Sequence, residues 1–325
     1  MRRRLTIAGL LLVVFLSPAS AKAQTELPPE TRNAALRYWL AFADLQDPPA
    51  DKSTQDLLEK TASGETAWDD AKLGAILDQN QRAIQEMQRA TKLPECDWGL
   101  EYGRGPEASI AYVPRARVLA RLNTLYGMRM LARGQTQEAV DAWLDGIRFS
   151  RHLAQGGTLI FKLVARMSLL SDFNAFARAA EAGQLDEAQK QEIAATVRAL
   201  PDDGFDWGEA MAYEEASLEI AVRQMKQAIS PAAYYQEILG QPVPADFSIP
   251  DTKDLAACRS VFTQAEAALR LRPEKARTSL PDLQGRVTQL HPFFQKTIPS
   301  LVRINDARLE IESSRAKLLA ATGKS

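Results

Sequence analysis

Two Asp-Trp-Gly triplets, at residues 97–99 and 206–208, carry the side chains in this sequence that are best suited to holding a ligand. Carboxylates and arginines supply charge, and tryptophan and tyrosine supply flat surfaces on which sugars and peptides stack. The first triplet is followed by two more glycines, which would let a ligand approach the backbone closely. The predicted ligand-binding residues are Asp97, Trp98, Glu101, Tyr102, Arg104, Asp206, Trp207 and Glu209.

Both loops also have a structural interpretation. The loop at 96–106 would close one end of a helical core with Trp98 buried, because aromatic side chains mostly pack. The acidic residues around Trp207 would form a solvated helix face, which is the commoner fate of like charges. Carboxylates of the two loops brought into one cleft would instead suit glycoside hydrolysis or a divalent cation.

Histidine and cysteine offer little further chemistry. His152 and His291 are the only histidines, and no serine or cysteine motif accompanies them, so we predict no catalytic residue, no metal and no cofactor. We expect His152 to be a positively charged imidazole at a helix end. Cys96 and Cys258 either form one disulfide in an oxidising compartment or remain two buried free thiols.

The amino terminus has the pattern of a cleavable secretory signal peptide. Three arginines at 2–4 precede an apolar run from Leu5 to Leu16, which is shorter than the ~20 residues that a spanning helix needs. Small residues at Ala21 and Ala23 predict cleavage after Ala23 and therefore a periplasmic or secreted protein. An uncleaved anchor is the alternative.

The remaining composition is that of a globular protein with a modest acidic excess. Cleavage would leave 302 of the 325 residues, with 36 basic against 41 acidic side chains and a net charge of −5. This charge argues against a nucleic-acid partner. No later segment is apolar enough to predict a transmembrane helix, since Lys162 and Arg166 interrupt the longest candidate.

Amphipathic helices are the predicted elements throughout. Apolar residues recur at spacings of three and four in most long segments, and strand-like alternation is confined to 109–113 and 247–249. The predicted helices are 29–45, 68–91, 115–133, 137–153, 159–181, 187–200, 207–229, 231–239, 252–271 and 301–321. We expect one helical domain over 24–240, a proline-rich linker at 241–250, and C-terminal helices at 251–325 that pack on the same body.

One turn occurs twice in similar form. Gly134 to Ala139 and Gly183 to Ala188 each join two predicted helices through Gly-Gln, and each ends in Glu-Ala. The glycine would end the first helix, and the alanine would let the second helix approach it closely. This pattern is typical of stacked helical hairpins.

The hairpin at 115–153 resembles a tetratricopeptide repeat. Gly127, Ala139, Trp143 and Gly146 match its small, small, aromatic and small positions, whereas Asn123 replaces its usual tryptophan. The two turns lie 49 residues apart instead of the ~34 of that family. The resemblance implies antiparallel hairpins stacked into an array that holds peptides or partner proteins; a generic α-hairpin is the alternative.

The predicted fold is all-α, as an array of antiparallel helical hairpins that is either a TPR-like α-solenoid or an irregular helical bundle. The hairpins and the lack of catalytic motifs favour an exported, non-enzymatic protein that binds a partner protein, a peptide or a small ligand near Trp98 and Trp207. One alternative is an exported hydrolase that uses carboxylates of the two Asp-Trp-Gly loops. Another is a structural component of the cell envelope. A fold class alone does not choose among them.

Overall fold

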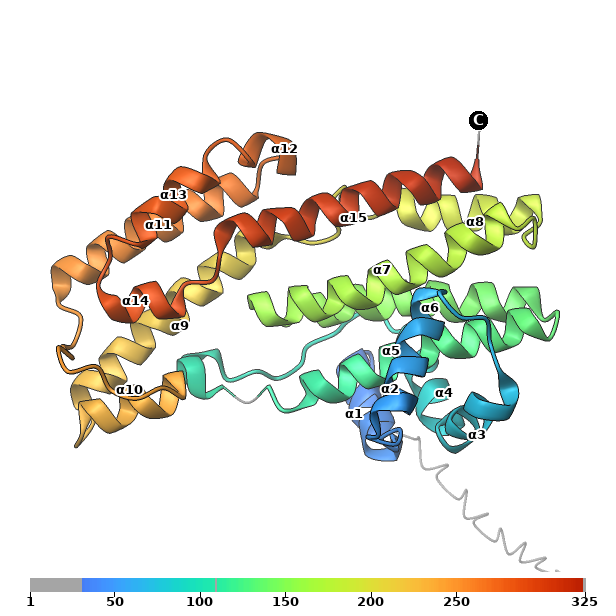
Figure 1. Ribbon diagram of the computed structural model, residues 1–325, viewed down its shortest axis with the longest axis horizontal. Helices are drawn as coiled ribbons and strands as arrows, with labels where there is room; N and C mark the ends of the chain where they lie inside the picture. The colour runs from blue at the N-terminus through green and yellow to red at the C-terminus, as the bar shows by residue number, and fades with distance from the viewer. Residues whose placement is uncertain (1–30, 109, 324–325) are drawn as a thin grey trace, which may run out of the picture. The chain divides into compact units, whose positions relative to one another are not determined.

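Helices supply the regular structure of the chain, whose computed structural model describes residues 31–108 and 110–323 (Figure 1). No β-strand occurs in these described residues; Asn33 and Glu95 form a single isolated bridge. The all-α prediction is therefore confirmed. The predicted leader, residues 1–23, lies outside the described residues. None of the described helices combines the length and the apolar character needed to cross a membrane.

The helices are numbered α1–α15 in chain order, with one 3-10 helix, η1. Their bounds are α1 Ala34–Asp44, α2 Lys52–Ser63, α3 Asp70–Gln79, α4 Gln81–Ala90, η1 Tyr102–Glu107, α5 Tyr112–Ala132, α6 Thr136–Ala154, α7 Leu159–Glu181, α8 Glu187–Arg198, α9 Trp207–Gln227, α10 Pro231–Leu239, α11 Thr252–Leu269, α12 Pro273–Ala276, α13 Leu280–Val287, α14 Pro292–Thr297 and α15 Leu301–Thr322.

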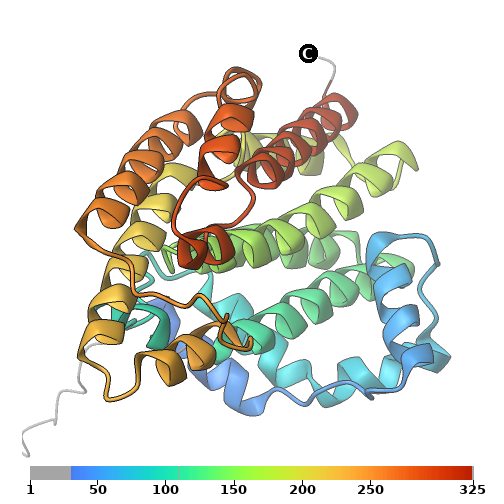
Figure 2. The ribbon, with the colours of Figure 1, turned by 60° about the vertical axis from the view of Figure 1, so that its left-hand side comes forward.

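Three consecutive helices, α5, α6 and α7, form the centre of the described fold (Figures 1 and 2). Short turns join them, and α6 packs against both neighbours along its length. Gly134 follows the end of α5 and has φ 75°, and Gly183 follows the end of α7 and has φ 68°. Both are in the left-handed conformation that glycine adopts at low cost. The two similar turns of the sequence are thus helix ends of the same kind.

Small residues let these helices approach closely. Gly127 on α5 lies under the Trp143 ring of α6, and the Trp143 indole N–H donates to the Thr124 carbonyl at 3.0 Å. Gly146 on α6 lies against the carboxyl of Asp172 on α7, and a side chain at Gly146 would overlap it. Gly127 and Trp143 therefore sit at the α5–α6 crossing of the predicted hairpin, and Gly146 sits at the crossing of α6 with α7.

Gly146→Ala is expected to lower the free energy of unfolding by about 2 kcal/mol, because the new methyl group overpacks the α6–α7 crossing. Chemical denaturation measures this loss. Gly285→Ala on α13 is the matched control, since nothing lies within 4 Å of a methyl group there. If Gly146→Ala lowers the free energy of unfolding no more than Gly285→Ala does, the α6–α7 crossing accommodates the methyl group and the prediction is wrong.

The remaining helices pack around this centre. On one side α15 lies along α7 and also contacts α8, and on another α9 packs against η1 and α11. α11 follows the proline-rich segment at 241–250 and packs against α9, which precedes that segment in the chain. The described residues from 32 to 323 accordingly form one compact unit.

Several helix boundaries differ from the prediction. The single helix expected at 68–91 is interrupted at Asn80, whose side-chain amide donates to the Ile76 carbonyl at 2.9 Å. The segment between the predicted helices 68–91 and 115–133 contains η1, and the segment between the predicted helices 252–271 and 301–321 contains α12, α13 and α14. The helix α2, Lys52–Ser63, was not predicted at all.

Candidate functional site

The indole of Trp98 belongs to a buried aromatic cluster. The Trp98 side chain is 5% exposed, and its ring stacks on Tyr112 and Tyr38 with centroid distances of 4.6 and 5.4 Å. Its N–H donates to the His152 carbonyl at 2.8 Å. The indole that was predicted to stack on a ligand is therefore covered by other aromatic side chains of the protein.

The polar residues of the same loop are exposed and bond to one another. The Asp97 carboxylate accepts from the Gly99 amide at 2.9 Å, and Arg104 pairs with Glu101 at 3.2 Å. Tyr102 donates to the Gly156 carbonyl at 2.8 Å, which ties the loop to the end of α6. These contacts fasten η1 and the loop to the helices.

The second Asp-Trp-Gly triplet begins α9. Asp206 caps this helix by accepting from the Glu209 amide at 2.9 Å, and Trp207 is fully buried. Glu209 pairs at 2.9 Å with Lys162, a lysine that is only 2% exposed. All three predicted residues therefore have structural contacts at the start of α9.

A cavity of about 360 Å³ opens beside this triplet. Asp206 and Trp207 line it together with Asp203, Arg272 and Arg308. The arginines that line it are already paired within the protein: the buried Arg308 bonds to Asp203 at 2.7 Å, and Arg272 bonds to Asp202 at 3.1 Å. No residue of the first loop lines this cavity, so the carboxylates of the two loops do not meet in it.

The structure corrects the expected charge of His152 and decides between the two alternatives for the cysteines. Burial and, to a smaller extent, the nearby Arg151 charge lower the pKa of His152 to about 4, so this imidazole is neutral at pH 7 instead of positively charged. The Tyr38 hydroxyl bonds to its Nδ1 at 2.8 Å. Cys96 and Cys258 are both free, which is the second of the two alternatives, although only Cys258 is buried and Cys96 is half-buried. Burial raises the pKa of each thiol to about 12.

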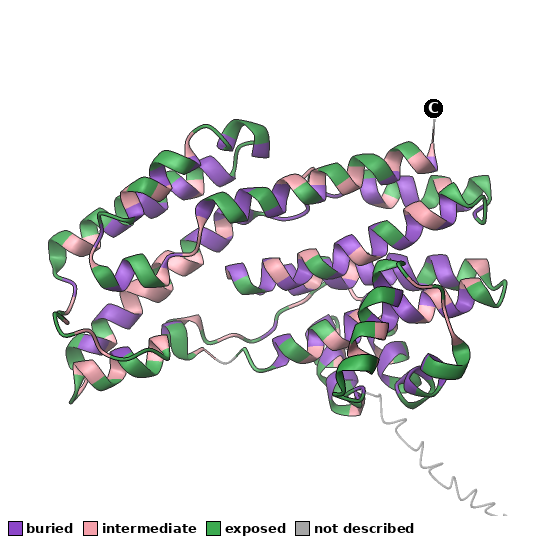
Figure 3. Cartoon of the chain, viewed as in Figure 1, coloured by how far each residue is buried: buried purple, intermediate pink, exposed green. Residues whose placement is uncertain are grey.

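A second candidate region surrounds helix α2, which was not predicted from the sequence. Helix α2 packs across α5 and α7 and buries only three side chains, those of Leu58, Thr61 and Ala62. Six of its 12 residues are exposed (Figure 3). The α5–α7 groove, defined here as the surface of α5 and α7 that α2 crosses, thus holds a short and mostly polar helix.

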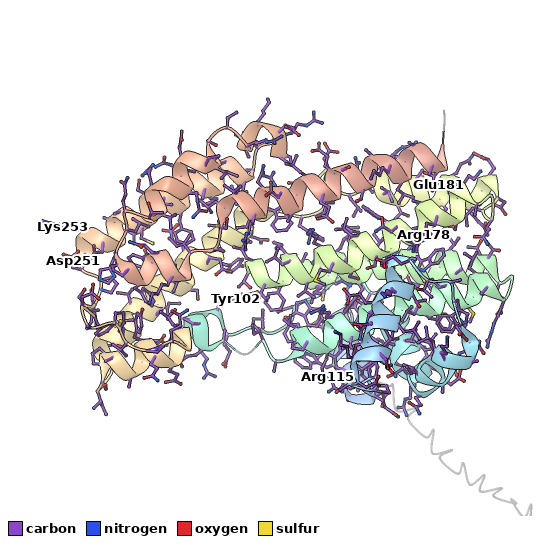
Figure 4. The ribbon with its side chains drawn as sticks, in the orientation of Figure 1. Tyr102, Arg115, Arg178, Glu181, Asp251 and Lys253 are labelled. Carbon is purple, nitrogen blue, oxygen red and sulfur yellow. The ribbon has the colours of Figure 1, made fainter. Side chains whose placement is uncertain are left out.

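Two arginines of the groove hold α2 through neutral acceptors. Arg121 on α5 donates to the Gln55 side chain at 2.9 Å. Arg178 on α7 reaches the last turn of α2, where it donates to the Ser63 carbonyl (Figure 4). The adjacent Gly64 has φ 78° and leaves no room for a side chain beside the Arg178 guanidinium. Neither arginine forms an ion pair within the described residues.

On one side of α2 lies a cavity of about 190 Å³, here called the arginine cavity. Arg117 and Arg121 line it from α5, while Val164, Met167 and Leu170 form an apolar wall on α7. Within residues 31–108 and 110–323, Arg117 makes no ion pair or hydrogen bond. The cavity therefore combines unpaired positive charge with an apolar wall.

On the other side of α2 lies a cavity of about 260 Å³. Arg178, Trp143 and Thr61 line it, and the Thr61 hydroxyl and one Arg178 amino group are buried without a hydrogen-bond partner. Burial lowers the pKa of Arg178, while the Glu181 charge acts against this shift. A helix that leaves cavities on both flanks and buried donors unpaired fills the groove incompletely.

No protein-family model matches the chain, and no curated protein or solved structure is similar to it. The part of the chain that is described contains no cluster of three or more histidine, cysteine, aspartate or glutamate residues suited to a metal ion.

The sequence does contain a weak signal for α2, although this helix was not predicted. Asp51 caps its first turn by accepting from the Thr54 amide at 2.9 Å, and Gly64 ends it. An acidic cap and a glycine stop with twelve residues between them are typical helix boundaries. The apolar pattern between them is too sparse to have indicated which surface α2 covers.

Proposed function

We propose that this chain is an exported, non-enzymatic binding protein whose α5–α7 groove takes an acidic helical segment of a partner protein in place of α2. The supporting observation is that a helix of this chain already lies in the groove but fills it incompletely. The resemblance to helical-hairpin repeats and the predicted leader are consistent with this function in the cell envelope.

The charges of the groove indicate the chemistry of the partner. Arg117, Arg121 and Arg178 have no carboxylate partner among the described residues, and Arg121 bonds to a neutral amide of Gln55. A carboxylate at the position of Gln55 would make a charge-assisted hydrogen bond, which is about twice as strong as a neutral one. A partner helix with acidic residues on one face would therefore bind more tightly than α2.

A peptide with the sequence of residues 51–64 tests this proposal. Leu58→Asp in the full chain removes the apolar anchor of α2, since Leu58 is 1% exposed. We expect the fluorescently labelled peptide to bind the Leu58→Asp protein, as measured by anisotropy, and to bind wild type poorly because α2 occupies the groove. The same peptide with Gln55→Glu should bind the Leu58→Asp protein about tenfold more tightly.

Lys60→Ala, at an exposed position of α2, is the matched control and should behave as wild type. Circular dichroism first establishes that the Leu58→Asp protein keeps its other helices. If that folded protein binds neither peptide, the groove does not accept a helix in trans and the proposal is wrong.

A further inference from the structure

The arginine cavity beside α2 suits a small amphiphilic anion, a use that goes beyond the helix exchange proposed above. Its polar side carries Arg117 and Arg121, and its apolar side is formed by Val164, Met167 and Leu170. Ser168, which is 6% exposed, also lines it, and its hydroxyl has no hydrogen-bond partner. Positive charge, an unused hydroxyl and an apolar wall thus surround one small space.

The two guanidinium groups are incompletely neutralised. Burial lowers the pKa of Arg121, and the Arg117 charge lowers it further, while Glu59 acts in the opposite direction. Glu59 also lines the cavity but lies outside ion-pair distance of either arginine. Two positive charges and one negative charge leave a net charge of +1, which a single carboxylate would balance.

The size of the cavity limits the ligand. A cavity of about 150 Å³ holds a six-carbon ring such as benzene. At about 190 Å³ the arginine cavity has room for roughly eight non-hydrogen atoms. This is the size of a carboxylate with a short alkyl chain, and the guanidinium fork matches carboxylate geometry.

We infer that the arginine cavity binds a short-chain carboxylate, with the carboxylate at Arg117 and Arg121 and the alkyl chain against Val164, Met167 and Leu170. The Ser168 hydroxyl supplies a further donor beside the carboxylate. Glu59, Ala62 and Ser63 of α2 complete the wall, so the site requires α2 to be in place.

Sodium hexanoate is the probe, titrated into the isotopically labelled wild-type chain and followed by heteronuclear NMR. We expect saturable shifts confined to the backbone around 117–124 and 164–174. Hexan-1-ol, hexylammonium and acetate should each bind at least tenfold more weakly, because each lacks either the charge or the alkyl chain. Equal affinity for hexan-1-ol or for acetate would overturn the inference, as would hexanoate shifts elsewhere in the chain.

Arg117→Gln is the decisive variant, because Arg117 is exposed and makes no hydrogen bond or ion pair within the described residues. It should weaken hexanoate binding at least tenfold, and Arg121→Gln should do the same. Arg151→Gln, at an exposed position on α6, should leave it unchanged. Unaltered binding by Arg117→Gln contradicts the site. The peptide-binding experiment uses the Leu58→Asp protein, in which α2 is released, whereas this titration uses the wild-type chain with α2 in place. Either proposal can therefore fail alone.

Discussion

Trp98→Ala is expected to lower the free energy of unfolding by about 4 kcal/mol, because it removes a large buried aromatic side chain. The change removes a 5% exposed indole that stacks on Tyr112 and Tyr38. It also leaves the His152 carbonyl without its 2.8 Å donor. Urea denaturation at pH 7 measures the loss.

Two further variants separate packing from other effects. Trp98→Phe keeps an aromatic ring but loses the indole N–H, so it should cost about 1 kcal/mol for the hydrogen bond, plus any repacking. Trp39→Ala removes a tryptophan that is 43% exposed and should also cost about 1 kcal/mol. A Trp98→Ala protein as stable as Trp39→Ala would contradict the packing role and restore Trp98 as a ligand-binding candidate.

Acidification is expected to destabilise the fold through His152. In the unfolded chain a histidine has a pKa of about 6.5, whereas burial lowers that of folded His152 to about 4. Between these values the unfolded state binds the additional proton, so stability is complete above pH 6.5 and is lost as the pH falls toward 4. The loss from this one group is about 3 kcal/mol.

His152→Gln should remove this contribution, because glutamine does not titrate. The measurement is the free energy of unfolding at pH 7 and at pH 4, and wild type should lose about 3 kcal/mol more than the variant over this interval. Arg151→Gln removes the second cause of the shift and should reduce the difference. An equal loss in wild type and His152→Gln would mean that His152 is solvated.

The sequence predicts the long helices well for a physical reason. Each combines a continuous apolar face with a recognisable end, such as Gly134 and Gly183 with positive φ, or Asp186 in a capping box with Gln189. The break at Asn80 is not predictable in this way, because Asn80 ends one helix and begins the next without any change in the apolar pattern.

The candidate site is harder to derive because it depends on tertiary contacts. The type of a side chain does not show whether it is buried, so Trp98 and Trp207 are equally consistent with packing and with stacking on a ligand. Arg117 and Arg121 are ordinary helix residues in the sequence. Their significance comes from α2, which crosses α5 and α7 and leaves a cavity beside these arginines.

The proposed exchange of α2 for a partner helix requires that α2 leaves its groove while α5 and α7 stay folded. Native-state hydrogen exchange on the wild-type chain tests this most directly, because it compares the opening free energy of each helix in one experiment. We predict that the amides of 54–63 exchange by local opening, with clearly lower protection than the buried turns of α5 and α7. Equal protection of α2, α5 and α7, set by global unfolding alone, would contradict the account.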